Sequence, residues 1–167
     1  MKKSSIYGEH SRTIVFLQVV IVALGIAALA AWIRFPMTEG RAVNLDLFSI
    51  YWDPVIAYMY VASIPFFVAL YQAFKLLEYI GQNKVFSLSS VKALRAIKYC
   101  AIAIIAFIVA GVVLLVITQG GSEDLAGPVA LGIMTTFVTI VIATAAAVFE
   151  RTLQSAVDIK SENDLTV

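Results

Sequence analysis

The chain has 167 residues, of which 61% are hydrophobic and 14% are charged, and its formal net charge is +1. Soluble domains average about 45–50% apolar and about 25% charged residues, so this composition excludes an ordinary soluble domain and a disordered chain. One cysteine and one histidine exclude a disulfide framework and a closed zinc site within one chain. The near-neutral charge gives no sign of direct nucleic-acid binding.

Four segments without Asp, Glu, Lys or Arg are long enough to cross a bilayer. They cover residues 13–33, 54–74, 99–118 and 128–149. At about 1.5 Å rise per residue each reaches roughly 30 Å, the thickness of the hydrocarbon layer, and in lipid such segments satisfy their backbone as helices. The sequence therefore predicts an all-α integral membrane four-helix bundle that forms one domain over residues 1–167.

The first apolar segment has a second interpretation as a cleaved signal peptide. Lys2 and Lys3 precede it, and Ala28-Leu29-Ala30 is similar to a signal-peptidase site. However, its apolar core is longer than is usual for a signal peptide, and twelve residues precede it. We expect a retained helix.

The distribution of basic residues predicts the orientation. Ten of the twelve Lys and Arg residues lie in the N-terminal segment, in residues 75–98 or in residues 150–167, whereas only Arg34 and Arg41 lie in the other connections. Short loops rich in Lys and Arg stay on the cytoplasmic side. We expect both termini (N-in/C-in) and a helical hairpin over residues 75–98 in the cytoplasm.

The connection over residues 34–53 is predicted to be an outer loop, and it is about half apolar. We expect it to fold onto the outer ends of the helices. A ligand or partner site is the alternative, because long loops in compact proteins are often functional.

Within the predicted spans the residues indicate packing rather than chemistry. Small residues recur at helical spacing, which lets membrane helices approach closely; they include Ala23, Ala27 and Ala31 in the first span and Thr135, Thr139, Ala143 and Ala147 in the fourth. A pore or groove lined by the threonines is the alternative.

Pro65 removes a hydrogen bond within the second span and predicts a helix kink. No Asp, Glu or His lies in a span, which argues against proton-coupled transport.

Catalytic motifs are missing from the sequence. It contains no Gly-x-Ser-x-Gly, no His-Glu-x-x-His and no phosphate-binding glycine loop. Cys100 opens the third span, where a packing role is expected and a reactive or palmitoylated thiol is the alternative. We therefore expect no enzyme activity, no catalytic residues, no cofactor and no metal.

The hairpin has clear helix boundaries in the sequence. The second span continues past Lys75, with Gly81 as the expected C-cap, and Ser87 is the expected N-cap of the next helix. Phe86 and Val91 have the spacing of a hydrophobic staple. The hairpin is predicted either to anchor the protein on anionic lipid or to dock a cytosolic partner.

Candidate docking residues lie in both cytoplasmic elements. They are Lys84, Phe86, Ser87, Lys92 and Arg95 in the hairpin, and Asp164, Leu165 and Val167 in the tail. An acidic segment with a short Leu-Thr-Val end could fray or could add to the surface of a partner.

Four strings in the chain are similar to one known family. They are IPFFVALYQAFKLL (64–77), NKVFS (83–87), SVKALRAIKYC (90–100) and ENDLTV (162–167). Together they resemble the YoaS-like family of small bacterial membrane proteins, a domain of unknown function, over nearly the whole chain. The resemblance implies four membrane helices in the bacterial plasma (inner) membrane, without an established activity or established site residues to carry over.

The resemblance also implies a partner. Members of this family are often encoded beside a very small helix-turn-helix regulator, so a cytosolic DNA-binding protein is the expected partner. Our leading hypothesis is a non-enzymatic interaction or signalling protein that holds this regulator at the membrane. The alternative is an oligomeric transporter or channel component for a small neutral or lipophilic solute, in which the partners are the bilayer and further copies of the chain.

Overall fold

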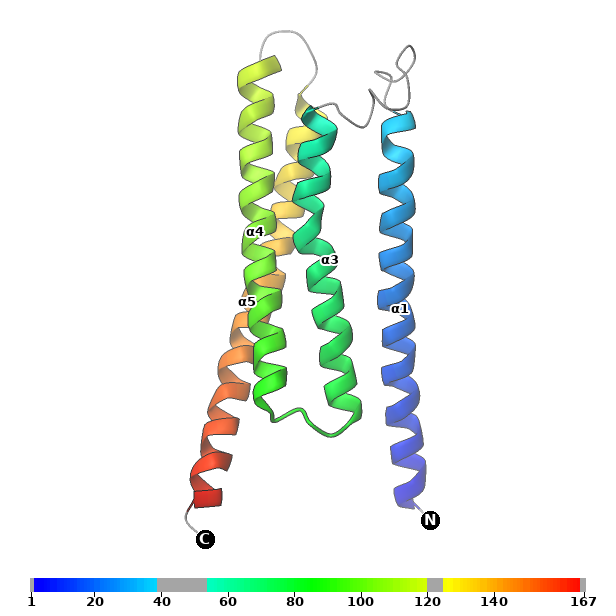
Figure 1. Cartoon of the computed structure of the whole chain (residues 1–167), viewed down its shortest axis with the longest axis vertical. Helices are drawn as coiled ribbons and strands as arrows, with labels where there is room; N and C mark the ends of the chain where they lie inside the picture. Colours follow the sequence, from blue (N-terminus) through cyan, green and yellow to red (C-terminus); the bar gives the residue numbers. More distant parts are fainter. Residues whose placement is uncertain (1, 39–53, 120–124, 166–167) are drawn as a thin grey trace.

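The computed structural model describes residues 2–38, 54–119 and 125–165, with side chains over 12–35, 54–117 and 125–163. These parts form four helices, drawn in Figure 1: α1 (Lys2–Thr38), α3 (Pro54–Gly81), α4 (Leu88–Gln119) and α5 (Ala126–Leu165). Each is long and apolar enough to cross a membrane. The prediction of an all-α protein with four candidate spans is therefore confirmed for the described residues. The outer loop falls mainly on residues 39–53, which lie outside them.

The helices are longer than the charge-free segments from which they were predicted. α5 has 40 residues and α1 has 37, and at about 1.5 Å per residue α5 is roughly twice as long as the hydrocarbon layer is thick. Both chain ends and the α3–α4 turn lie at the same end of the helices, and α1 and α5 extend beyond that turn (Figure 1). We call this end of the molecule the terminal side and the other end the opposite side.

Packing between the helices follows their order in the chain. α1 packs on α3, α3 on α4 and α4 on α5, whereas the remaining pairs barely touch. The four helices thus pack in chain order, and we call this arrangement the row. α5 lies behind α4, and its upper part is seen between α4 and α3 (Figure 1). Few side chains are buried, and large apolar side chains are exposed along every helix, as expected for surfaces that contact lipid.

Two contacts hold α1 against α3. On the opposite side, the hydroxyl of Tyr60 donates a hydrogen bond to the carbonyl oxygen of Trp32 at 3.1 Å, and the two rings lie with centroids 6.0 Å apart. On the terminal side, Ile14 is buried, and its Cδ1 lies 3.6 Å from the position of a β-carbon built on Gly81. α1 therefore contacts α3 at two separate levels, around Ile14 and around Trp32.

Pro65 lies inside α3, which continues through it as helix. The nearby hydroxyl of Ser63 donates a hydrogen bond to the carbonyl of Tyr60 at 2.7 Å. The kink at Pro65 stays a prediction.

Candidate docking surface and intramembrane groove

The end of α3 is fixed by Asn83 rather than by Gly81. Asn83 has a φ of 56°, the left-handed conformation that asparagine tolerates better than most residues. The amide of Lys84 donates to the carbonyl of Tyr79 at 2.8 Å, and the amide of Asn83 donates to that of Ile80 at 3.1 Å. These two bonds define a Schellman motif. The expected C-cap was therefore wrong by two residues, because Gly81 keeps a negative φ and is the last helical residue.

The start of α4 agrees with the sequence prediction. The hydroxyl of Ser87 accepts a hydrogen bond from the amide of Ser90 at 3.3 Å, so Ser87 is the N-cap. Ser90 is fully buried, and its own hydroxyl donates to the carbonyl of Lys84 at 2.9 Å. The six residues between the two helices are thus tied to both of them, and the hydroxyl of Ser87 is occupied by this structural role.

The turn presents apolar and basic side chains together. Phe86 and Leu88 expose 60% and 57% of their surface, and Lys84 and Lys92 are also exposed. We call these four residues the hairpin surface. Val91, the expected partner of Phe86 in a hydrophobic staple, is buried, whereas most of the Phe86 ring is not. Leu88 was missed by the sequence prediction, although its position directly after an N-cap places it on the first turn of the helix.

Arg95 takes part in an ion-pair cluster with α5. Its Nε donates to Oε1 of Glu150 at 2.7 Å, and Nζ of Lys98 donates to Oε2 of the same carboxylate at 2.6 Å. The Glu150 side chain is only 9% exposed. A carboxylate this buried requires such partners, because desolvation otherwise disfavours its charge. Arg95 is therefore a structural link between α4 and α5 as well as a surface cation.

The charge of Glu150 is stabilised by this arrangement. Hydrogen bonds from Lys98 and Arg95 lower the pKa of the carboxyl below its ordinary value, and they outweigh the opposing effect of burial. The same pairing raises the pKa of Arg95. Glu150 and Arg95 are therefore both charged at neutral pH, and their ionic contact joins α4 to α5.

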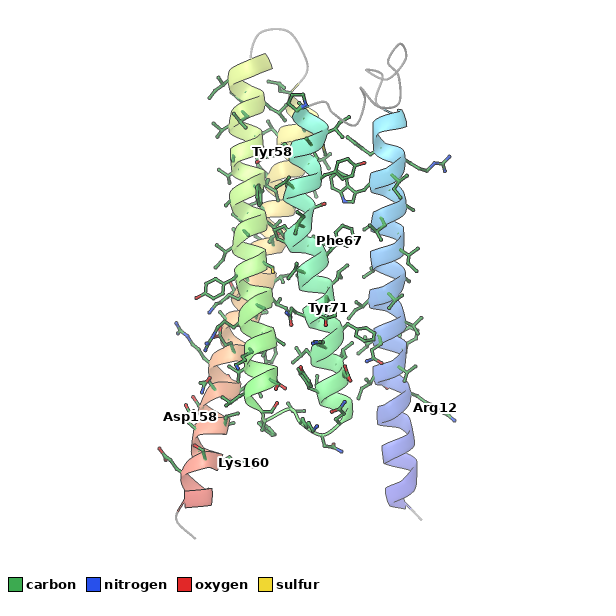
Figure 2. All side chains as sticks on the ribbon, in the orientation of Figure 1. Arg12, Tyr58, Phe67, Tyr71, Asp158 and Lys160 are labelled. Atoms are coloured by element: carbon green, nitrogen blue, oxygen red, sulfur yellow. The ribbon has the colours of Figure 1, made fainter. Side chains whose placement is uncertain are left out.

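The tail residues predicted as docking groups end α5. Asp164 and Leu165 belong to its last turn, but their side chains lie outside the described part, and Val167 lies outside the described residues altogether. Asp158 and Lys160, labelled in Figure 2, lie near the end of α5 where it extends past the α3–α4 turn. Any contact of these tail candidates with the hairpin surface lies outside the described part of the chain.

A large apolar groove runs along the row of helices inside the predicted spans. Its volume is about 1140 Å³, and none of its lining residues is charged. α3 lines it from Pro54 to Ala73, which at about 1.5 Å per residue matches the hydrocarbon thickness. Thr135 and Thr139 lie on its wall, but each hydroxyl donates to a carbonyl one turn earlier in α5. The groove is thus suited to apolar groups and not to ions.

Glycines permit the close packing of α4 beside this groove. The hydroxyl of Tyr58 donates to the carbonyl of Phe107 at 2.6 Å, and a β-carbon on Gly111 would lie 3.2 Å from the Tyr58 ring (Figure 2). A β-carbon on Gly132 of α5 would lie only 2.9 Å from Cγ2 of Val112. Real β-carbons do not approach so closely. A β-carbon at Gly132 would therefore displace the Val112 methyl group, and one at Gly111 would displace the Tyr58 ring by a few tenths of an ångström.

Metal ligands do not converge within the described residues, where no three of His, Cys, Asp and Glu form a group that could hold an ion. Cys100 is a half-buried free thiol.

Comparison with known proteins agrees with the helical membrane architecture. Residues 30–167 match the model of a family described as "Protein of unknown function (DUF2975)". The chain is also 44% identical over 161 residues to a Bacillus subtilis (strain 168) protein named "Uncharacterized membrane protein YoaS", and this match covers 92% of the chain and 96% of the relative. No solved structure matches the chain. The resemblance inferred from the four sequence strings is thereby confirmed, and the chain belongs to the DUF2975 family of YoaS-like membrane proteins.

Proposed function

We propose that this protein is a non-enzymatic component of the bacterial plasma membrane that holds a small cytosolic helix-turn-helix regulator through the hairpin surface. The observation that carries the proposal is the exposure of Phe86 and Leu88 on a turn whose backbone is tied to both adjoining helices. Exposed aromatic and aliphatic side chains on a rigid support are the usual anchors of protein interfaces. The partner itself is taken from the gene neighbourhood implied by the family resemblance.

The proposed orientation places the terminal side in the cytoplasm. The positive-inside rule supports it, because the α3–α4 turn, both ends of the chain and ten of the twelve basic residues belong to this side. The hairpin surface then faces the compartment in which a DNA-binding protein works. Lys84 and Lys92 flank the apolar pair, so the complementary face of the regulator is apolar with an acidic rim.

A photo-crosslinking residue introduced at Phe86 in intact cells is expected to capture the regulator, identified by mass spectrometry of the purified adduct. Leu88→Asp is expected to reduce the recovered adduct about tenfold, because a charge is placed in the apolar part of the interface. The matched control is Ile159→Asp on α5, which adds the same charge at a side chain that is 61% exposed. This control is expected to leave recovery unchanged.

Two results would contradict the proposal. If the only adducts recovered join two copies of the chain, the regulator is not the partner of the hairpin surface. Equal losses for Leu88→Asp and Ile159→Asp would show that the hairpin surface is not the docking site.

A second candidate function is transport of a small lipophilic solute, and the groove is the observation that favours it. The groove has an uncharged lining, and its volume of about 1140 Å³ slightly exceeds that of typical ligand pockets, which occupy about 300–1,000 Å³. Such a transporter would work as an oligomer, in which exposed apolar side chains of the helices contact a second copy.

Filling the groove tests this second function. Ala62 lines it, whereas Ala57 is exposed on the same helix and does not. If solute moves along the groove, Ala62→Leu is expected to reduce the flux of a lipophilic dye in reconstituted vesicles several-fold, while Ala57→Leu leaves it unchanged. Equal flux in both variants, or in vesicles without protein, argues against transport.

A further inference from the structure

We propose that the junction of α4 and α5 binds the phosphate headgroup of an anionic phospholipid. The site consists of Lys92, Arg95 and Lys98 of α4 and of Glu150 and Arg151 of α5, and we call it the seam cluster. The inference concerns the anchoring of the protein in its bilayer, and it does not depend on the partner proposed for the hairpin surface.

The seam cluster carries more positive than negative charge. Glu150 is its one carboxylate and is shared by Arg95 and Lys98 at 2.7 and 2.6 Å. Lys92 lies three residues from Arg95, and Arg151 follows Glu150 directly, so both lie within about one helical turn of the ion pair. Both are exposed, and neither forms an ion pair with any described residue. The seam cluster thus contains four cations and one anion, which leaves an excess charge of three.

Arg95 is positioned to hold a second anion in addition to Glu150. Only its Nε contacts the carboxylate, and its side chain is 51% exposed. A guanidinium carries five N–H groups in a fixed planar arrangement, so its terminal nitrogens stay available for a phosphate oxygen. Because Glu150 fixes the orientation of the guanidinium, little conformational entropy remains to be lost when the phosphate binds.

The depth of the seam cluster identifies a lipid as the source of the phosphate. Lys98 directly precedes the charge-free residues 99–118, and Glu150 directly follows the charge-free residues 128–149. The seam cluster therefore lies where hydrocarbon gives way to headgroups. Tyr99 is 60% exposed at this level, with Nζ of Lys98 5.0 Å from its ring centroid, as expected for an aromatic residue in the headgroup region. Basic sites between membrane helices at this depth recognise anionic lipid headgroups.

Lipid retention by the full-length protein tests the proposal. The protein is reconstituted in nanodiscs with equal amounts of phosphatidylglycerol and phosphatidylcholine that carry the same acyl chains, and retained lipids are counted by native mass spectrometry. We expect the protein to prefer phosphatidylglycerol about 25-fold, since Lys92 and Arg151 each contribute about a factor of five to anionic-lipid binding.

The variant Lys92→Gln/Arg151→Gln is expected to lose most of this preference. It keeps the Arg95–Glu150–Lys98 contacts, so the fold is retained. The matched control is Lys84→Gln/Lys160→Gln, which removes the same charge from exposed positions outside the seam cluster and is expected to keep the preference. Addition of excess inorganic phosphate is expected not to displace the lipid.

Three results would overturn the proposal. They are equal retention of the two lipids, equal losses in the seam variant and in the control, and displacement by inorganic phosphate. The last result would assign the seam cluster to a free anion. Lys92 belongs to both the hairpin surface and the seam cluster, but the lipid measurement contains no regulator and capture at Phe86 is measured separately, so the two proposals can fail independently.

Discussion

Replacing Glu150 with glutamine is expected to destabilise the protein by about 2 kcal/mol, a value between those typical of exposed and of buried ion pairs. Arg95 and Lys98 converge on the two oxygens of a side chain that is only 9% exposed. Glutamine keeps the shape of the side chain but has only one oxygen that can accept a hydrogen bond. Its NH₂ group would face one of the two cations, so two donors would then meet without an acceptor. Thermal unfolding in detergent micelles measures the loss.

The matched control for Glu150→Gln is Asp158→Asn, which neutralises an exposed carboxylate on the same helix. It is expected to change stability by less than about 0.5 kcal/mol.

In a Glu150→Leu background, additional replacement of Lys98 by methionine is expected to restore part of the stability, because the unpaired cation is removed together with its desolvation cost. A control loss as large as that of Glu150→Gln would show that the contact is not specific.

The effect of Glu150→Gln depends on pH in a direction fixed by the lowered pKa of Glu150. A carboxyl whose pKa is lower in the folded state contributes stability that is complete above its unfolded pKa, about 4.3 for glutamate. This contribution is lost as the pH falls through the lowered folded pKa. The stability difference between the wild type and Glu150→Gln is therefore expected to be constant near neutral pH and to disappear in acid.

Gly132→Leu is expected to separate α4 from α5 on the opposite side and to cost about 1–3 kcal/mol, the usual range for overpacking. A β-carbon at this position would lie 2.9 Å from Cγ2 of Val112 and 3.5 Å from Cγ2 of Ile108. The further atoms of leucine have no space unless the helices move apart. Gly132→Ala is expected to have a smaller effect, because only the Val112 methyl group must shift. Thermal unfolding measures both losses.

Ala130→Leu is the matched control for Gly132→Leu. Ala130 lies near the start of the same helix and is exposed. Because alanine and leucine are both strong helix formers, this variant is expected to change stability by less than about 0.5 kcal/mol. Combining Gly132→Ala with Val112→Ala is expected to show favourable coupling, since the second change removes the methyl group that the first one displaces. If the stability losses of the two single variants simply add in the double variant, the strain of Gly132→Ala does not come from the Val112 methyl group.

The sequence was most informative where short-range chemistry determines the structure. The absence of charge over about twenty residues located the spans, and the serine after Phe86 located the start of α4, confirmed by its bond to the amide of Ser90. The end of α3 was placed two residues early, because both glycine and asparagine can end a helix and the sequence pattern favoured the glycine. The structure shows that Asn83 takes the left-handed conformation.

The contact between Glu150 and α4 was missed, although a signal for it was present. Glu150 follows the fourth charge-free segment directly, and Lys98 precedes the third directly. Because consecutive membrane helices are antiparallel, these two boundaries lie at the same level, and opposite charges there predict a pair. The groove gave no comparable signal. Residues facing lipid and residues facing another helix are equally apolar, so the hydrophobic pattern does not show which helix faces line the groove.

The chain-order packing of the row has a consequence for biosynthesis. Because α3 packs on α1, α4 on α3 and α5 on α4, each new helix meets its main neighbour already in the membrane when it leaves the ribosome and the insertion machinery. No helix has to wait for a distant segment, and contacts of short sequence separation form rapidly. α5, synthesised last, adds the Glu150 carboxylate to two cations that have until then been exposed, so the final ionic contact of the row forms when synthesis is nearly finished.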